Sequence, residues 1–357
     1  TDYRNVPSLN ADSSGVGIVW SDRDSSLGGS SDSDIVFRYD SGNGWSAPEL
    51  ISEHYYEADS EIPVLASAGD WLYMLYRDGG DLDQEEDSNG NDAHGDDGDI
   101  FFRRSGNNAE SWSDPVVVSQ INGDGDSNGG LSGHMYHSAI AAVDSYVYAA
   151  WVDWNLMDGD DYYDYEIMFA ISPDYGASWG EPFILSSSYG DDYSYEPVIV
   201  AESSHVYVAW RDWGNVDSSG TDYDINFRHS EDYGQNWDDT IVPYDNDDAD
   251  YYPALALGGD RVHLALIEYR QDPDSTIYDY YVVSLWSDDY GNSWTEPVVV
   301  SNEDESNLAD YPVLAADSDT LYIAWSDYGN YDGDGISDYD VIFKSSENGG
   351  TSWSQPV

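Results

Sequence analysis

The feature that most constrains the fold of this chain is a unit that recurs six times along it. Each unit opens with a short apolar run, such as IPVLAS from residue 62, and continues with a run of alternating polarity, such as LYMLY. An acidic segment, a third run such as DIFFR, a turn with tryptophan and a fourth run follow. Because the runs are short, aliphatic or aromatic, and bounded by Gly, Asp and Ser, they predict four β-strands per unit.

The unit length indicates how these strands assemble. Six units in 357 residues give about 60 residues each, the size of a four-stranded propeller blade. No long segment has helical periodicity. The sequence therefore predicts an all-β protein, a single six-bladed β-propeller of four-stranded antiparallel blades. A solenoid is the alternative, but a closed ring leaves fewer open strand edges. The expected blades span about 1–53, 54–122, 133–189, 190–246, 247–303 and 304–357.

A second repeated pattern lies in the turn after the third run. SPDYGASW (172–179), SEDYGQNW (230–237) and SDDYGNSW (287–294) fit S-x-D-x-G-x-x-W, and residues 105–112 and 346–353 are weaker copies. This pattern resembles the Asp-box, or BNR, repeat of the sialidase-like β-propellers. The resemblance implies a structural role, in which Ser and Asp close a hairpin turn, Gly has a positive φ and Trp packs between blades.

The same resemblance implies that glycoside hydrolysis has to be considered. A sialidase-type site needs three convergent arginines, a tyrosine nucleophile and an acid, and the family has an Arg-Ile-Pro motif. Here Glu61 precedes IPVLAS and Asn5 precedes VPSLNA, so that motif is absent. The sequence therefore favours a non-enzymatic protein without catalytic residues. A sialidase-like glycoside hydrolase or a carbohydrate-binding propeller is the alternative.

The charge balance excludes several partners. The chain has 11 Lys and Arg against 72 Asp and Glu, a formal charge of -61. Nucleic acid and anionic membrane surfaces need basic protein surface and are excluded. There is no cysteine for a disulfide and no 18-residue apolar run to span a bilayer. Without an initiator Met or a signal peptide, the sequence is expected to be a processed or trimmed product.

The segment NYDGDGISDYD (330–340) has the spacing of a calcium loop. Alternate oxygen-bearing side chains converge, a glycine permits the bend, and a backbone carbonyl adds an oxygen. It resembles the loops of EF-hands and of integrin-like propellers, with a solvated turn as the alternative. The predicted ligands are Asn330, Asp332, Asp334, the carbonyl of Ile336, and Asp338. Weaker copies place Asp124, Asp126 and Asn128 in one loop, and Asn215, Asp217, Asp222 and Asp224 in another.

Carboxylates also recur where the second run ends and the third begins. The second run ends in an acid in every unit, namely Asp22, Asp78, Asp153, Asp212, Glu268 and Asp327. A D-x-[DEY] motif precedes the third run in every unit. Its first residues are Asp32, Asp97, Asp164, Asp222, Asp279 and Asp338. In four units its third residue is also an aspartate, namely Asp34, Asp99, Asp224 and Asp340. Because the two runs are expected to be antiparallel neighbours, these acids meet and repel unless a cation lies between them. Several bound Ca²⁺ ions are predicted, with adaptation to high salt as the alternative.

These patterns together predict a role. We expect a calcium-binding, extracellular or cell-surface propeller that acts as a structural, adhesive or self-assembling module. Its expected partners are divalent cations and either copies of itself or surface glycans. Tyrosine-rich segments at 160–166 and 189–196 suit interfaces, because tyrosine combines apolar area with a polar tip. His134 and His137 are not expected to bind a metal.

Overall fold

The structure, a computed structural model, describes residues 7–23, 33–52, 59–79, 99–119, 137–155, 164–186, 193–213, 222–246, 248–271, 278–301, 308–329 and 338–357. These residues form strands and turns, without a helix among them. Accordingly, no helix in the described ranges is able to span a membrane. The chain divides into two compact units, unit 1 (Thr1–Asp191) and unit 2 (Asp192–Val357).

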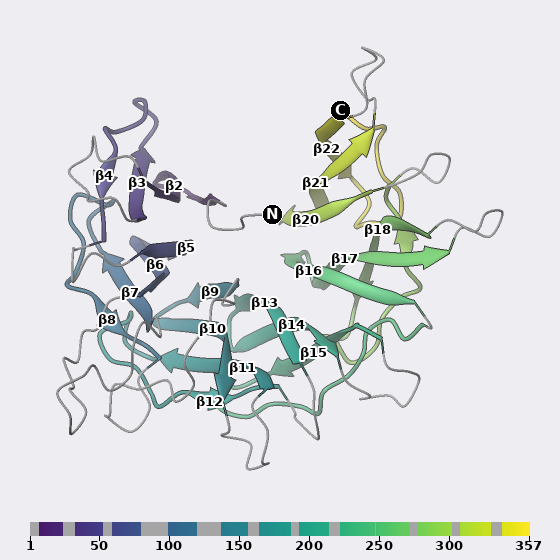
Figure 1. The fold of residues 1–357 in the computed structure, drawn as a ribbon, viewed down its shortest axis with the longest axis horizontal. Helices are drawn as coiled ribbons and strands as arrows, with labels where there is room; N and C mark the ends of the chain where they lie inside the picture. Colours follow the sequence, from purple (N-terminus) through teal and green to yellow (C-terminus); the bar gives the residue numbers. More distant parts are fainter. Residues whose placement is uncertain are drawn as a thin grey trace. The chain divides into compact units, whose positions relative to one another are not determined.

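Unit 1 contains three antiparallel meanders, each built from strands that follow one another in sequence (Figure 1). The first has β1 (Ser8–Asp12), β2 (Gly15–Asp22), β3 (Asp34–Asp40) and β4 (Glu49–Leu50). The second has β5 (Ser60–Ala68), β6 (Trp71–Asp78), β7 (Asp99–Ser105) and β8 (Val116–Val117). The third has β9 (Ser138–Val143), β10 (Tyr146–Asn155), β11 (Asp164–Ser172) and β12 (Phe183–Ile184).

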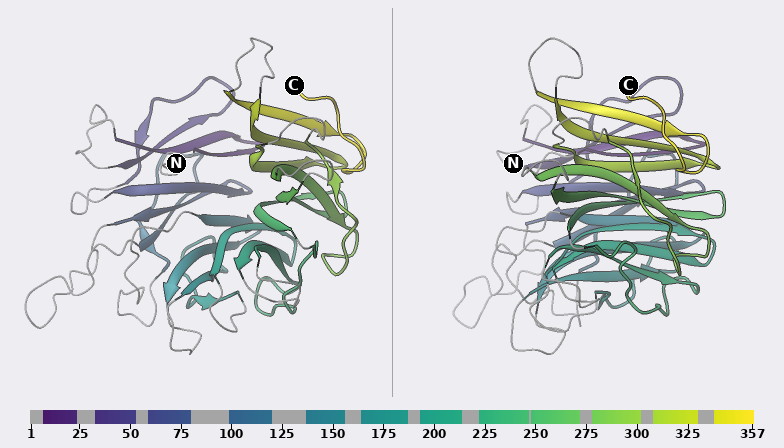
Figure 2. Two further views of the ribbon diagram at one scale, coloured as in Figure 1. Left: turned by 45° about the vertical axis from the view of Figure 1, so that its right-hand side comes forward. Right: turned by 90° about the vertical axis from the view of Figure 1, so that its right-hand side faces the viewer.

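Unit 2 also contains three meanders, and Figure 2 shows their long strands running side by side. The first has β13 (Tyr193–Glu202), β14 (His205–Trp213) and β15 (Asp224–Ser230). The second has β16 (Ala249–Gly258), β17 (Arg261–Gln271), β18 (Tyr278–Ser287) and β19 (Val298–Val299). The third has β20 (Asp310–Asp317), β21 (Thr320–Gly329) and β22 (Asp338–Ser346).

The predicted all-β class and the propeller arrangement of small antiparallel sheets are confirmed, but the prediction of six four-stranded blades is wrong. Among the described residues four meanders have four strands, and β13–β15 and β20–β22 have three. After β15, only Ile241 bridges back, exchanging two backbone hydrogen bonds with Phe227. Pro243 follows two residues later and has no N–H to extend that ladder. After β22, Val357 and Phe343 likewise exchange two backbone hydrogen bonds.

The core lies around the second strand of each meander. In β6, Tyr73, Met74 and Leu75 are each fully buried, so both faces of this strand pack against other residues. One apolar cluster of unit 1 joins Tyr73 and Leu75 to Trp151 of β10, and one of unit 2 joins β14, β15, β17 and β18. Burial on both faces explains why these strands read as nearly continuous apolar runs.

Four of the first strands, β5, β13, β16 and β20, have a bulge just before a proline. Ile62, Glu196, Tyr252 and Tyr311 each have a positive φ, between 51° and 57°, and the register shifts there in β5, β13, β16 and β20. Such a bulge leaves a residue outside the regular ladder and redirects its side chain. The bulge therefore determines where Glu196 and Tyr252 point.

The S-x-D-x-G turns have one set of hydrogen bonds. In residues 172–179, the Ser172 hydroxyl accepts from Gly176 N (2.8 Å) and donates to Asp174 (2.9 Å), whose carboxylate also accepts from Ser178 N (2.8 Å). The turns at 230–237 and 287–294 repeat these bonds. The hydrogen bonds lower the pKa of Asp174, although burial opposes them. These aspartates are fully used in holding the turns.

Candidate functional site

A cationic side chain surrounded by tyrosines lies in unit 2. The guanidinium carbon of Arg211, on β14, is 5.0 Å from the ring centre of Tyr195, 4.7 Å from Tyr223 and 5.4 Å from Tyr251. The three tyrosines come from β13, from the residue before β15, and from β16, and all are half-buried. We call this group, with Glu196, Tyr252, Tyr311 and Asp310, the tyrosine site.

Glu196 is the buried carboxyl group of this site. Its Oε1 is 3.3 Å from Nη1 of Arg211, and its Oε2 accepts a hydrogen bond from Tyr252 N at 3.1 Å. Burial, with a smaller contribution from the charge of Asp310, nevertheless raises the pKa of Glu196 to about 7, against the opposing effects of Arg211 and the Tyr252 hydrogen bond. Burial also raises the pKa of Asp310, to about 6. Two carboxyl groups of the tyrosine site therefore exchange protons close to neutral pH.

Two further tyrosines face each other beside these acids. The ring centres of Tyr252 and Tyr311 are 4.5 Å apart, and each residue occupies the bulge before a proline. Half-buried aromatic faces, a guanidinium and carboxyl groups together offer stacking surface, hydrogen-bond donors and acceptors. This combination suits a polar ligand that also has apolar faces.

The sequence patterns did not identify this site. Only Tyr195 and Glu196 lie in a segment that was singled out, the tyrosine-rich run at 189–196. The sequence does contain a signal for this grouping. Glu or Tyr stands directly before proline in several first strands, and Arg follows an aromatic residue near the end of several second strands. Unit 1 has a related pair, in which Arg77 Nη1 lies 3.8 Å from Glu61 Oε2.

The strand register brings predicted carboxylates together in five meanders. The partners are Asp22 and Asp34, Asp78 and Asp99, Asp153 and Glu166, Asp212 and Asp224, and Asp327 and Asp340. In every pair the partner is the third residue of the D-x-[DEY] motif and not the first. In the remaining meander Tyr281 lies opposite Glu268. Glu166 was missed as a candidate ligand, because sequence spacing does not fix the register between two strands.

Hydroxyl groups and indole rings contact many of these buried carboxylates. Asp212 is 4% exposed and accepts from Ser194 Oγ at 2.6 Å and from Trp210 Nε1 at 3.0 Å. Burial still raises its pKa. Comparable serine bonds reach Asp34, Asp78 and Asp99, at 2.6 to 3.0 Å. The charge of these pairs is thus partly stabilised by protein donors before any cation is considered.

Asp250 is a fully buried carboxyl group of unit 2. It is 0% exposed, lies opposite Glu268 in the register of β16 and β17, and neither of its oxygens makes a hydrogen bond with the described residues. Its pKa is raised well above the usual value by burial, then by Glu268 and Asp224, and the nearby Asn246 amide only partly offsets this. Glu268 itself is held by Tyr244 (3.0 Å) and Arg270 (2.9 Å).

Most of the predicted calcium-loop residues lie outside the described residues. These are Asp32, Asp97, Asp124, Asp126, Asn128, Asn215, Asp217, Asn330, Asp332, Asp334 and Ile336. Of the others, Asp338 is exposed, Asp222 and Asp340 are half-buried, and Asp164 pairs with Asn155 in the ladder of β10 and β11. The calcium loops therefore stay a prediction.

Comparisons with known proteins agree with the fold. No family model matches the sequence, and no curated protein sequence matches it. Among solved structures, an ulvan lyase of a new polysaccharide lyase family is similar with a TM-score of 0.59 and 12% identity, over 99% of this chain and 83% of the lyase. An α-L-arabinanase from Penicillium chrysogenum has a TM-score of 0.53 and 11% identity, over 82% and 79%.

A third similar structure is the sialidase of Trypanosoma rangeli, with a TM-score of 0.55 and 14% identity over 95% of this chain. The chain spans only 54% of that sialidase. Identities this low establish the fold alone. The chain is a β-propeller.

Proposed function

We propose that this chain is a carbohydrate-binding β-propeller and that its tyrosine site holds a sugar unit. The observation that carries the proposal is Arg211 among Tyr195, Tyr223 and Tyr251, with the buried Glu196 at its other side. Tyrosine faces stack on the apolar faces of a sugar, and the charged groups bind its hydroxyls. The similar sialidase, arabinanase and polysaccharide lyase support carbohydrate as the ligand class.

The charges favour a neutral sugar over an acidic one. Arg211 is paired with Glu196 and has Asp310 near that pair, so little positive potential is left for an anionic group. The net charge of -61 adds a long-range repulsion toward polyanions. A carboxylated sugar needs convergent arginines. Neutral polysaccharides are therefore the expected ligands.

Affinity electrophoresis through gels containing neutral or acidic polysaccharides tests this proposal. Retardation by a neutral polysaccharide is expected, and Tyr252→Ala or Tyr311→Ala should weaken it about tenfold through loss of a stacked ring. Tyr322→Ala is the matched control, because Tyr322 is exposed on β21 and stacks on Phe343, outside the tyrosine site. If no neutral polysaccharide retards the chain, or if the control weakens retardation equally, the proposal is wrong.

Hydrolysis of a glycosidic bond is a second candidate, favoured by the two raised pKa values. A carboxyl group that holds its proton near neutral pH, such as Glu196, is suited to protonate a leaving oxygen. Asp310, with the lower pKa, loses its proton first and is therefore the group available to act as the base. Release of reducing sugar from neutral polysaccharides would support this, provided that Glu196→Gln abolishes turnover while the variant stays folded. Retardation without turnover would leave binding as the function.

Ca²⁺ is proposed as the cofactor of the acidic segments. Support comes from the strand register, which places two carboxyl groups opposite each other at five hairpins, and from Asp250, whose pKa burial raises well above its usual value. Oxygen-only ligand sets suit Ca²⁺. We further propose that the protein acts outside the cell or at its surface, and that its partners are surface glycans or other copies of itself.

The finer description of the fold is also a proposal. We infer that the S-x-D-x-G turns are Asp-boxes, on the support of their shared hydrogen bonds and of the positive φ of Gly176, Gly234 and Gly291. We infer that each of the antiparallel meanders is a blade. The two three-stranded meanders would then be blades with a fourth strand reduced to one bridge.

A further inference from the structure

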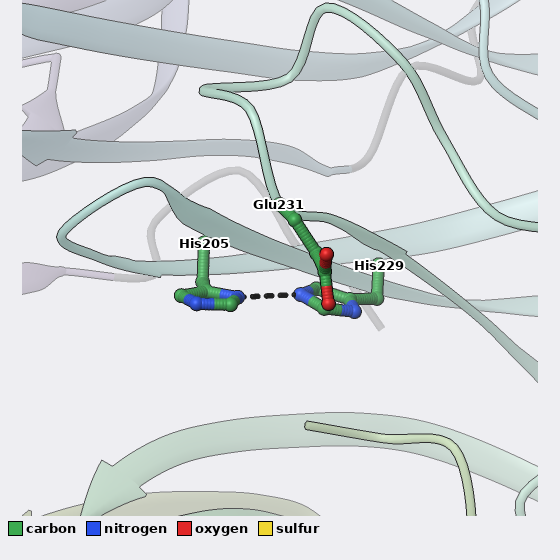
Figure 3. Close-up of side chains that lie close together, drawn as sticks. All are labelled: His205, His229 and Glu231. Carbon is green, nitrogen blue, oxygen red and sulfur yellow. Dashed lines mark hydrogen bonds between the residues drawn. The ribbon is translucent and has the colours of Figure 1, made fainter. Parts of the chain in front are cut away.

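Two histidines and a glutamate of unit 2 come together away from the tyrosine site. His205 begins β14, His229 is the second-last residue of β15, and Glu231 lies in the turn that follows (Figure 3). Nδ1 of His205 is 2.9 Å from Nε2 of His229, and a carboxylate oxygen of Glu231 completes a set in which all three ligand atoms lie within 4.8 Å of one another. Three donor atoms of two kinds therefore converge at one point.

Both imidazole rings are held in place by tyrosines. Tyr290 stacks on His205 with ring centres 4.6 Å apart and planes at 7°, and Tyr207 stacks on His229 at 4.7 Å and 10°. His229 is also buried, with 3% of its surface exposed. Stacking on both rings limits their rotation, so the facing nitrogens are largely preorganised.

The corresponding positions of other meanders carry a different pair. Trp71 and Arg104 occupy them in β6 and β7, with the guanidinium 5.1 Å from the indole centre, and Arg261 and Trp286 occupy them in β17 and β18, at 5.3 Å. Those pairs contain a permanent cation over an aromatic ring and have no free lone pair to donate. In β14 and β15 two imidazoles take these positions, and each supplies a metal-binding nitrogen.

A carboxylate lies beside the outer nitrogen of the His229 ring. Asp238 Oδ2 lies 3.5 Å from Nδ1, the nitrogen away from the cluster. A carboxylate at the outer nitrogen is the common arrangement of a metal-bound histidine, because it orients the ring and strengthens the inner nitrogen as a ligand.

We propose that His205, His229 and Glu231 form a binding site for a transition-metal dication, with Zn²⁺ the best fit. Two imidazoles and a carboxylate suit Zn²⁺, which takes four ligands and would complete its shell with water. Two nitrogens on one tetrahedral Zn²⁺ lie about 3.3 Å apart, so the ion would replace the hydrogen bond between the two imidazoles and widen their separation by a few tenths of an ångström. Ca²⁺ prefers oxygen ligands and would not compete well here.

The test is calorimetric titration of Zn²⁺ into the full chain with Ca²⁺ in excess, so that oxygen-only acidic sites are already filled. A tight saturable Zn²⁺ site is expected, and His205→Asn or His229→Asn should weaken it about 100-fold. Glu231→Gln removes the carboxylate ligand, and Asp238→Asn removes the carboxylate that orients His229. Each is expected to lower the Zn²⁺ affinity about tenfold. His137→Ala, a histidine outside the cluster, should bind Zn²⁺ as the unaltered chain does.

Two further measurements keep the result interpretable. Far-ultraviolet circular dichroism checks that each variant is folded, and Glu231→Gln on an exposed turn keeps the proposal testable if a histidine variant does not fold. Co²⁺ as a spectroscopic probe should give visible bands of a site with nitrogen ligands, and these should be absent in His205→Asn. The proposal is overturned if no Zn²⁺ binds above the Ca²⁺ background, or if all variants bind it equally.

Discussion

At the scale of single residues, Asp250 and Glu196 are carboxyl groups whose charged forms the fold disfavours. Both lie in unit 2, and burial is the main cause of each raised pKa. A carboxyl group with a raised pKa in the folded state contributes stability at low pH that is lost as the pH rises through its folded pKa. Each of them therefore makes a separate prediction about pH dependence.

Asp250→Asn should stabilise the chelator-treated protein at neutral pH by about 1–3 kcal/mol, because it removes a buried charge and keeps the shape of the side chain. The gain should vanish below about pH 4, where Asp250 is protonated in the folded and the unfolded states alike. Urea unfolding at both pH values measures it, with the exposed Asp260→Asn as control. A loss of stability in chelator would contradict the uncompensated charge.

Glu196→Gln should flatten the pH dependence of stability between about pH 4 and pH 8. In the unaltered chain the pKa near 7 means that stability falls as the pH rises across this range, by about 3 kcal/mol from this group. The variant cannot ionise, so its free energy of unfolding should change less. Urea unfolding across the range provides the measurement, and an unchanged slope would mean that Glu196 ionises normally.

At the scale of elements, the S-x-D-x-G turn combines a backbone requirement with a packing requirement. Gly176 has a φ of 76°, and a Cβ there would overlap the ring of Phe102. Phe102 in turn contacts Trp179 edge to face at 4.9 Å. The turn is thus joined to the core of unit 1 through an aromatic pair.

Gly176→Ala should destabilise the chain by about 2–4 kcal/mol, the sum of backbone strain at positive φ and overpacking against Phe102. Gly69→Ala is the matched control, since Gly69 has a φ of 58° and open space around its Cβ position. The control should cost only about 1–2 kcal/mol. Thermal unfolding of both variants compares them, and equal losses would show that packing at Phe102 does not matter.

At the scale of the whole molecule, the charge of -61 must be offset for the chain to be stable. Chelation should lower the melting temperature, and Ca²⁺ should restore it, because each ion bound at 100-fold excess over its Kd contributes about 2.7 kcal/mol. Calorimetry in chelator, millimolar Ca²⁺ and molar KCl distinguishes the causes. Equal protection by KCl and Ca²⁺ would mean general screening, as expected for adaptation to high salt.

Much about this protein follows from the sequence by itself. The sixfold repeat predicts the strands and their order, and S-x-D-x-G predicts the turn bonded through Ser172, Asp174 and Gly176. Both succeed because strand pattern and turn chemistry depend on residues that are close in sequence. The number of strands per blade was overpredicted, because Ile241 makes one bridge where a strand was expected.

Only the tertiary structure decides which side chains meet. The register of β10 and β11 places Glu166, and not Asp164, opposite Asp153. Arg211 gathers tyrosines from separate parts of the chain, and His205 reaches His229, which lies 24 positions later in the sequence. A shift of one residue in pairing would turn each of these side chains to the other face, and that pairing is fixed by packing of the core, which no local pattern encodes.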